Sequence, residues 1–199
     1  MKRRVVIIEN GGANTASLRH ALERLEVEPE VTRNEATILA ASHVILPGVG
    51  AARDAMSRLH SHGLDELIPR LTQPLLGICL GMQLLYEASE EGCAHCLGAI
   101  PGAARRLAAL PGRPVPHMGW NRLAPMVATP LLDGIEAGER AYFVHSYALP
   151  IGPETIAATD HGELFSAVVA HRNFFGTQFH PERSAHTGAR ILGNFLALT

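Results

Sequence analysis

The sequence predicts an α/β fold with a mixed, mostly parallel central sheet and helices on both of its faces. In the first half, short apolar runs alternate with segments of helical periodicity, a pattern typical of parallel strands joined by helices. In the second half, strand-like segments follow one another closely and favour antiparallel pairs that rejoin the main sheet. The chain has 199 residues, 47% of them hydrophobic, so we expect a single domain over residues 1–199 with a sizeable core.

The first strand and helix are predicted at the start of the chain. Residues 5–8 (VVII) form an uninterrupted apolar run, which indicates a buried strand. Gly11 and Gly12 then turn the chain, and Asn14 or Thr15 can cap a helix. The apolar positions of this helix recur at helical spacing: Leu18, Ala21, Leu22 and Leu25.

Two further strand and helix pairs follow. Residues 44–46 predict a strand that is closed by residues 47–50 (PGVG), and residues 51–59 predict a helix. Residues 75–78 predict a third short strand. Residues 80–87 continue directly from that region with good helix formers, so we expect a helix there.

The second half contains fewer helical signals. Between residues 92 and 116 glycine and proline are frequent, so we expect loops and short strands. Residues 188–198 predict a closing helix. Further strands are predicted at residues 141–149, 155–158, 167–170 and 174–179.

Charge and hydropathy exclude several classes of protein. The formal net charge of −2 gives no sign of a general polyanion binder, so a protein or small-molecule partner is favoured over nucleic acid. The apolar run at residues 5–8 ends at Glu9, too early for a secretion signal. No uninterrupted apolar segment approaches the roughly 20 residues that cross a bilayer. We therefore expect a cytoplasmic protein.

The three cysteines predict reduced thiols, since an odd number is a poor disulfide framework in a chain of this size. Cys93, His95 and Cys96 stand close enough in sequence to suggest zinc ligands, but a second ligand pair at zinc-site spacing is missing. Plain thiols in a loop are the favoured interpretation, and we predict no metal site.

Residues 77–81 (GICLG) have the G-x-nucleophile-x-G spacing of a nucleophile elbow, with Cys79 as the nucleophile. A sharp strand-to-helix turn crowds the residues beside the nucleophile, and glycines have no Cβ to collide. The turn also brings the sulfur to a helix N-terminus, which favours the reactive thiolate. A small buried cysteine that closes a strand is an equally good interpretation of these five residues alone.

His180 and Glu182 supply the groups that such a nucleophile needs. If this segment is extended, residues two apart project to the same face, so the imidazole and the carboxylate can lie side by side. Glu182 would then fix the ring tautomer that presents the other nitrogen to Cys79. Pro181 suits a strand end or edge. Together with the elbow, this pair favours catalysis over a solvated turn.

Acyl chemistry also needs hydrogen-bond donors for an oxyanion. Residues 47–50 (PGVG) at a strand end can aim backbone N–H groups into a site, because glycine has no Cβ to obstruct them. An ordinary tight turn is the alternative.

These motifs together resemble the class I, or triad, glutamine amidotransferases, in which Cys, His and Glu occur in that chain order. The resemblance rests on residues 77–83 (GICLGMQ) and 176–182 (GTQFHPE) and covers almost the whole chain. Within this superfamily, three more segments resemble the glutaminase subunits of imidazole glycerol phosphate synthase: residues 47–56, 117–121 (HMGWN) and 142–147 (YFVHSY).

Two positions depart from the family pattern. Residues 9–14 read ENGGAN where the family usually reads close to Asp-Tyr-Gly-x-Gly-Asn, so one glycine and the final asparagine are kept. Arg183 replaces the lysine that commonly follows the His-Pro-Glu triplet. Both positions lie near surfaces that the family uses for its partner.

The resemblance implies a flavodoxin-like glutaminase domain that hydrolyses glutamine to glutamate and ammonia without a cofactor. It implies a heterodimer with a separate cyclase subunit, a (β/α)8 barrel. Ammonia would pass through this barrel to a ribonucleotide bearing a ribulosyl group, giving imidazole glycerol phosphate and AICAR in histidine biosynthesis.

The resemblance also implies roles for particular residues. Cys79, His180 and Glu182 would be the catalytic triad, and backbone N–H groups at Val49 and Leu80 would form the oxyanion hole. The substrate would be held by Gly48, Gly50, Gln83, Ser146 and Tyr147. The partner would contact His117, Met118, Trp120, Asn121 and Arg183.

Three rival functions remain open on the sequence. The chain can be the glutaminase of another amidotransferase, which a different synthase would accompany. A cysteine hydrolase or peptidase of similar architecture needs only the elbow. A glutaminase-like binding module is disfavoured because all three residues of the triad are present.

Overall fold

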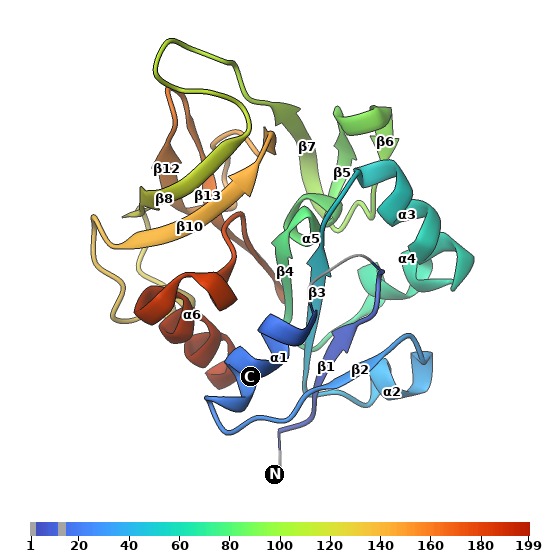
Figure 1. Ribbon diagram of the computed structural model, residues 1–199. Helices are drawn as coiled ribbons and strands as arrows, with labels where there is room; N and C mark the ends of the chain where they lie inside the picture. The colour runs from blue at the N-terminus through green and yellow to red at the C-terminus, as the bar shows by residue number, and fades with distance from the viewer. Residues whose placement is uncertain (1–2, 12–14) are drawn as a thin grey trace.

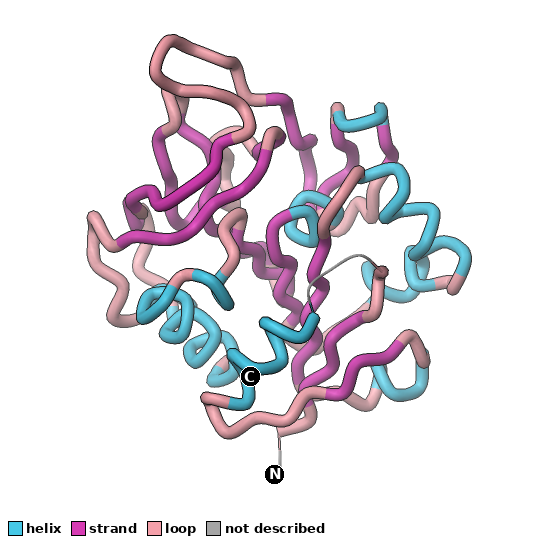
Figure 2. Tube along the Cα trace, viewed as in Figure 1, coloured by secondary structure: helices cyan, strands magenta, loops and turns pink. Residues whose placement is uncertain are grey.

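The computed structural model describes residues 3–11 and 15–199 and contains a layered α/β fold around an eight-stranded sheet (Figures 1 and 2). The strand order is β2-β1-β3-β4-β14-β13-β12-β9. The first five strands run parallel, whereas β13, β12 and β9 join antiparallel. The predicted mixed, mostly parallel sheet is confirmed. The strands are β1 (Val5–Ile8), β2 (Glu30–Thr32), β3 (His43–Gly48), β4 (Leu75–Cys79), β9 (Ala124–Pro125), β12 (Thr155–Asp160), β13 (Leu164–His171) and β14 (Phe174–Thr177).

Helices cover both faces of this sheet, as the alternation of apolar residues in β1 requires. Val5 and Ile7 pack on one face with α1 (Thr15–Glu23) and α6 (Ala185–Ala197). Val6 and Ile8 pack on the other face with α2, α3 and α4. Successive residues of a strand point to opposite faces, so one apolar run supplies both cores. These three helices are α2 (Glu35–Leu39), α3 (Ala52–Ser61) and α4 (Leu64–Leu67).

Two smaller sheets stand beside the main one (Figure 1). The first is an antiparallel pair of β8 (His117–Arg122) and β10 (Arg140–His145). The second contains β5 (Tyr86–Ser89), β6 (Ala94–His95), β7 (Ile100–Arg106) and β11 (Tyr147–Ala148). The described residues also contain four short 3₁₀ helices: η1 (Ile68–Arg70), η2 (Glu91–Cys93), η3 (Pro130–Leu132) and η4 (Pro181–Arg183).

The helix expected at residues 80–87 is wrong in its second half. α5 (Leu80–Leu84) ends after five residues, and β5 begins at Tyr86. The carbonyls of residues 84–86 accept hydrogen bonds from the N–H groups of residues 97, 100 and 98, respectively. These carbonyls cannot then continue the helical ladder, so pairing with distant residues overrides the helix propensity.

Other boundaries differ from the sequence expectation for similar reasons. The strand expected at residues 141–149 is divided at Ser146, because β10 and β11 belong to different sheets. The closing helix starts earlier than expected, at Ala185. The short elements β2 and α2 were not predicted. Gly12 and Asn14, expected in a turn and a helix cap, lie outside the described residues.

The sheet brings the candidate residues to one edge. Because β3, β4 and β14 are parallel neighbours, their carboxyl ends lie together, with Gly48 opposite Cys79 and Ile78 opposite Thr177. Ligands of open α/β sheets bind at this edge. Within the described ranges, no helix is long and apolar enough to span a bilayer.

Candidate active site

Cys79 occupies a strained turn between β4 and α5. Its backbone has φ 54° and ψ −113°, a conformation that residues other than glycine rarely adopt. A Cβ on Gly81 would lie 1.8 Å from the Leu46 carbonyl oxygen, and one on Gly77 would lie 2.7 Å from the backbone of Gly81. The crowding expected for a nucleophile elbow is therefore present, and it explains both glycines.

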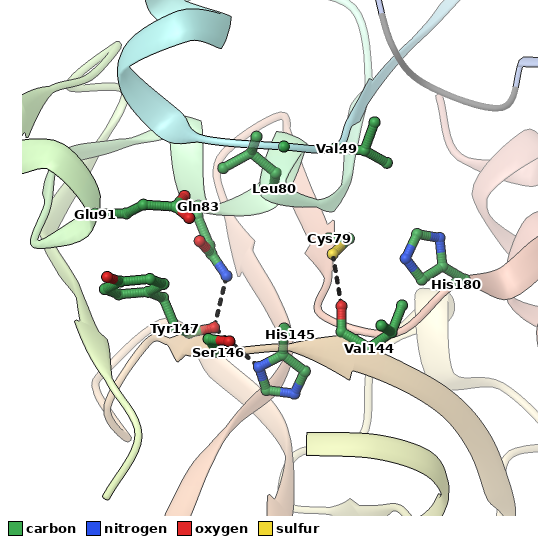
Figure 3. A pocket seen from close by; sticks show the side chains of 11 residues that line it. Val49, Cys79, Leu80, Gln83, Glu91, Val144, His145, Ser146, Tyr147 and His180 are labelled. Atoms are coloured by element: carbon green, nitrogen blue, oxygen red, sulfur yellow. Dashed lines mark hydrogen bonds between the residues drawn. The ribbon is translucent and has the colours of Figure 1, made fainter. Parts of the chain in front are cut away.

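The thiol of Cys79 is buried but reaches a cavity (Figure 3). Its Sγ lies 3.8 Å from the carbonyl oxygen of Val144 and 3.8 Å from Nε2 of Gln178. The His180 ring stands on the same side of the cavity and also interacts with the thiol. Residues far apart in the chain thus converge on one sulfur.

His180 is held by Glu182 through a contact of 2.9 Å between Nδ1 and Oε1. The expectation of an extended segment is wrong here, because Glu182 lies in η4 and only His180 is extended. The turn still brings the two side chains together. Since a carboxylate accepts, Nδ1 donates and Nε2 remains for the cysteine.

The pKa of His180 is raised to about 10. Burial by itself lowers this pKa, but hydrogen bonds to Cys79 and Glu182 and the attraction of their negative charges raise it by more. The site therefore favours the protonated, imidazolium form of His180.

The cavity beside Cys79 has a volume of about 310 Å³, large enough for an amino-acid substrate. Its lining combines predicted residues with Glu91 from η2 and with Val144 and His145 from β10. The lining residues are Val49, Gly50, Cys79, Leu80, Gln83, Glu91, Val144, His145, Ser146, Tyr147 and His180. Gly48 and Glu182 instead line a neighbouring cavity of about 140 Å³, on which Val49, Val144 and His180 also border.

Buried amides form the floor of the site. Gln83 Nε2 donates to the carbonyl oxygen of Tyr147 at 2.7 Å and to Oε1 of Gln178 at 2.9 Å. The other end of the Gln178 amide faces Cys79. This network links the helix after the elbow to the backbone of β11, so the cavity wall and the sulfur share one support.

Sequence reasoning missed several residues of the cavity. Glu91 carries the only carboxylate in the lining, and its Oε2 accepts the N–H of Ala52 at 2.9 Å. Burial raises the pKa of this carboxyl, and the bond from Ala52 opposes the shift. No spacing pattern marks Glu91, because it reaches the site from η2, the short helix between β5 and β6. Gln178 could have been found, since it lies in the same motif as His180.

The residues expected at a partner interface do not share one face. Met118 and Trp120 are 63% and 51% exposed, and Arg183 lies over the ring of Tyr142. His117 is only 4% exposed and packs inside, so its assignment to the surface is wrong. Asn121 also turns inward, towards His117. The cause is the pleat of β8, which sends alternate side chains to opposite faces.

The segment at residues 93–96 is not the plain loop that we expected, since Ala94 and His95 form β6. All three cysteines are free; Cys93 is exposed, and burial raises the pKa of Cys96 to about 11. Over residues 3–11 and 15–199, no group of three or more His, Cys, Asp or Glu residues is arranged to hold a metal ion.

Comparison with known families agrees with this geometry. The family model for glutamine amidotransferase class-I matches residues 6–198. This chain belongs to the class-I glutamine amidotransferase family.

Relatives within this family are close in sequence. The chain is 56% identical over 194 residues to the imidazole glycerol phosphate synthase subunit HisH of Xylella fastidiosa strain Temecula1, covering 98% of this chain and 97% of the relative. It is also 56% identical over 195 residues to the subunit of that name from Xanthomonas euvesicatoria, with 98% of each chain covered.

Solved structures share the amidotransferase fold at low identity. A putative GMP synthase subunit from Thermoplasma acidophilum superposes with a TM-score of 0.77 at 18% identity, covering 98% of this chain and 93% of that one. A second glutamine amidotransferase gives a TM-score of 0.75 at 20% identity, with 96% of each chain covered.

Proposed function

We propose that this amidotransferase is the glutaminase subunit of an imidazole glycerol phosphate synthase, with Cys79, His180 and Glu182 as its catalytic triad. The convergence of these three side chains beside a cavity of amino-acid size carries the proposal. Identity of 56% over nearly the full length to subunits of that synthase supports the particular enzyme.

In the proposed mechanism, the Cys79 thiolate attacks the side-chain amide carbon of glutamine and forms a tetrahedral oxyanion. His180 then gives its proton to the amide nitrogen, so the carbon–nitrogen bond breaks and ammonia leaves. A γ-glutamyl thioester remains. Water then attacks it, losing a proton to His180, and glutamate departs as the Cys79 sulfur leaves. Glu182 keeps the imidazole oriented throughout.

Backbone groups at Val49 and Leu80 are proposed as donors to the oxyanion. Leu80 is the first residue of α5, and the first N–H groups of a helix have no partner within it. Val49 lies directly after β3, against the elbow. One such donor is worth roughly 3 to 4 kcal/mol in comparable sites.

The remaining lining residues are proposed to hold the amino-acid end of glutamine. The Ser146–Tyr147 backbone would take the carboxylate side, and Glu91 would pair with the ammonium group. Both hydrogens of Gln83 Nε2 are already donated, so its Oε1 would be a further acceptor for the ammonium group. Glu91 suits this role because, among the described residues that line the cavity, it alone is acidic. Gly48 and Gly50 would let the backbone of Val49, which lies between them, adjust around the substrate.

The partner is proposed to be the cyclase subunit of the synthase, a (β/α)8 barrel in a heterodimer, which would receive the ammonia and release imidazole glycerol phosphate and AICAR. An exposed cluster of Met118, Trp120, Tyr142 and Arg183 provides a suitable surface, since aromatic side chains, methionine and arginine are enriched at interfaces. Val144, next on this face along β10, lines both cavities.

Three free cysteines fit a reducing compartment, so we place the enzyme in the cytoplasm.

Replacing the nucleophile tests the proposal. In the presence of the cyclase and its nucleotide, Cys79→Ala should abolish synthesis from glutamine but leave synthesis from ammonium salts. Cys93→Ala is the matched control, because this free cysteine does not line the cavity, and it should preserve both activities. Glutamine-dependent turnover by Cys79→Ala would exclude the assigned nucleophile.

A further inference from the structure

A chain of buried polar side chains runs from β8 to the cavity wall. Asn121 Nδ2 lies 3.2 Å from His117 Nε2, His117 Nδ1 lies 3.0 Å from His145 Nε2, and His145 Nδ1 lies 2.9 Å from the carbonyl oxygen of Tyr147. The last carbonyl belongs to the backbone beside the proposed glutamine site. It also accepts from Gln83.

The direction of every hydrogen bond in this chain is fixed by its last acceptor. A carbonyl oxygen can only accept, so His145 carries its proton on Nδ1 and its Nε2 must accept. His117 therefore donates from Nδ1 and accepts at Nε2 from Asn121.

The amide at the other end agrees with this direction. Asn121 Oδ1 accepts the N–H of Arg122 at 2.8 Å, so its nitrogen is free to donate to His117 and to the carbonyl oxygen of Asp160. One arrangement of protons satisfies every member.

We propose that Asn121, His117 and His145 are positioning residues that hold the Ser146–Tyr147 backbone in the conformation that binds glutamine. This inference rests on the proposed glutaminase function and deepens it.

The junction at Ser146 needs such support because it lies between two sheets. Ser146 connects β10 to β11 and belongs to neither strand pairing. Its carbonyl oxygen accepts the N–H of Leu107 at 2.9 Å, which ties the junction to the residue after β7. His145, the residue just before it, adds a second tie through the carbonyl oxygen of Tyr147.

Packing keeps the hydrogen-bonded series Asn121, His117 and His145, which we call the relay, rigid. The His117 ring is stacked between His161 and Phe143, with ring centroids 4.1 and 4.9 Å away. Phe165 meets His145 edge to face at 5.0 Å. A ring packed on both faces cannot flip without moving its neighbours, so the order of donors and acceptors is maintained.

The relay works only while its rings are neutral, because a second proton on either ring would lie on the Nε2 that has to accept. A donor of the neighbouring residue would then point at another donor. Burial lowers the pKa of His117 to about 3, and electrostatic repulsion involving His145, His161 and Arg113 adds to this lowering. Burial lowers the pKa of His145 to about 4; the bond to Tyr147 opposes this, and the nearby His161 and His180 add to it. Both histidine rings of the relay are therefore neutral around pH 7.

The outer end of the relay adjoins the exposed cluster. Asn121 follows Trp120 in β8, and the two side chains point to opposite faces of the strand. A partner that presses on Trp120 therefore acts on the strand that carries the first donor. This connection offers a physical route from the docking surface to the substrate site.

Covalent labelling with a diazoketone analogue of glutamine tests the relay. Labelling of Cys79 in the full chain, followed by mass spectrometry, gives a half-saturating concentration and a maximal rate separately. His145→Leu should raise the half-saturating concentration by about threefold to tenfold, the loss expected for one buried hydrogen bond, with no change in the maximal rate. His145→Asn should restore wild-type affinity, because its amide nitrogen can replace Nδ1 as the donor.

Controls separate positioning from general stability and from the proposed function. Phe165→Leu loosens the same cluster without removing a hydrogen bond, so it should lower the melting temperature and leave the half-saturating concentration unchanged. Equal affinity of His145→Leu and wild type, or equal weakening by Phe165→Leu, would overturn the relay. Wild-type protein in which the analogue never labels Cys79 would instead overturn the glutaminase function.

Discussion

Nδ1 of His180 lies 2.9 Å from Oε1 of Glu182, and the two side chains are 10% and 8% exposed. A carboxylate so buried acts on the imidazole with little screening by water. Glu182→Gln keeps the shape of the side chain but removes the charge that stabilises the imidazolium. We expect kcat for glutamine to fall at least about 100-fold with little change in KM. Steady-state kinetics with the cyclase present would measure both, and an unchanged kcat would contradict the role of Glu182.

The same pair predicts a pH dependence of stability. The pKa of His180 is raised from 6.5 to about 10, so the folded state binds the proton more tightly than the unfolded state. The stability that the folded protein gains from this tighter proton binding is fully present below pH 6.5 and is lost as the pH rises through about 10. The difference in free energy of unfolding between wild type and Glu182→Gln should be largest below pH 6.5 and should narrow as the pH rises towards 10. Urea denaturation at several pH values measures it.

The buried histidines of the relay predict the opposite behaviour on the acid side. His117 and His145 have pKa values lowered to about 3 and 4, so the unfolded state binds protons that the folded state refuses. Their contribution is full above pH 6.5 and is lost as the pH falls towards 4 and then 3, by up to about 1.4 kcal/mol per pH unit for each ring. His117→Gln cannot titrate and should reduce the slope of unfolding free energy between pH 6.5 and 5. An unchanged slope would show that His117 is not a cause of the pH dependence of the free energy of unfolding.

Two glycines should respond oppositely to the same substitution. Gly81→Ala places a methyl group 1.8 Å from the Leu46 carbonyl oxygen, and the backbone of β3 cannot move aside without disturbing the sheet. We expect the free energy of unfolding to fall by about 1 to 3 kcal/mol, as at other overpacked positions. Gly193→Ala meets open space inside α6 and should stabilise the protein by about 0.5 to 1 kcal/mol. Thermal denaturation of both variants provides the comparison.

The elbow and the parallel half of the sheet could be predicted because their signals are local. The apolar run at residues 5–8 and Gly77, where a Cβ would meet the backbone of Gly81, each reflect a constraint that lies within a few residues. The His180–Glu182 contact was also predictable from spacing, although the conformation was not. A 3₁₀ turn and an extended strand both bring residues two apart into reach, so sequence could not distinguish them.

The rest of the site depends on contacts between distant segments. Glu91 enters the cavity from η2, and the histidine relay joins β8 to β10 through the register that places His117 opposite His145. Neither register nor loop placement is written in a local pattern. The HMGWN segment shows the limit well, because its motif suggested one surface while the pleat divides its side chains between the core and an exposed face.

Glu91→Gln should separate substrate binding from chemistry. The amide oxygen can still accept the N–H of Ala52, so the start of α3 stays in place, but the charge that would pair with the substrate ammonium is gone. We expect KM for glutamine to rise by about tenfold or more with kcat nearly unchanged, since a charged hydrogen bond contributes about 1.5 to 3 kcal/mol. A fall in kcat at constant KM would instead assign Glu91 to the chemical step.

Trp120→Ala should weaken docking of the cyclase. Trp120 contacts Tyr142 at a ring distance of 5.9 Å, and the Arg183 guanidinium lies 4.9 Å from the centre of the Tyr142 ring, so the three side chains form one preorganised cluster. Burying such a tryptophan in an interface is typically worth about 2 kcal/mol or more, so Kd should rise by about 30-fold or more. Leu39→Ala is the control, because Leu39 is as exposed as Trp120 but lies in α2, on the far side of the molecule from β8 (Figure 1). Calorimetric titration of each variant with the cyclase measures Kd, and equal effects of the two substitutions would exclude this cluster as the docking surface.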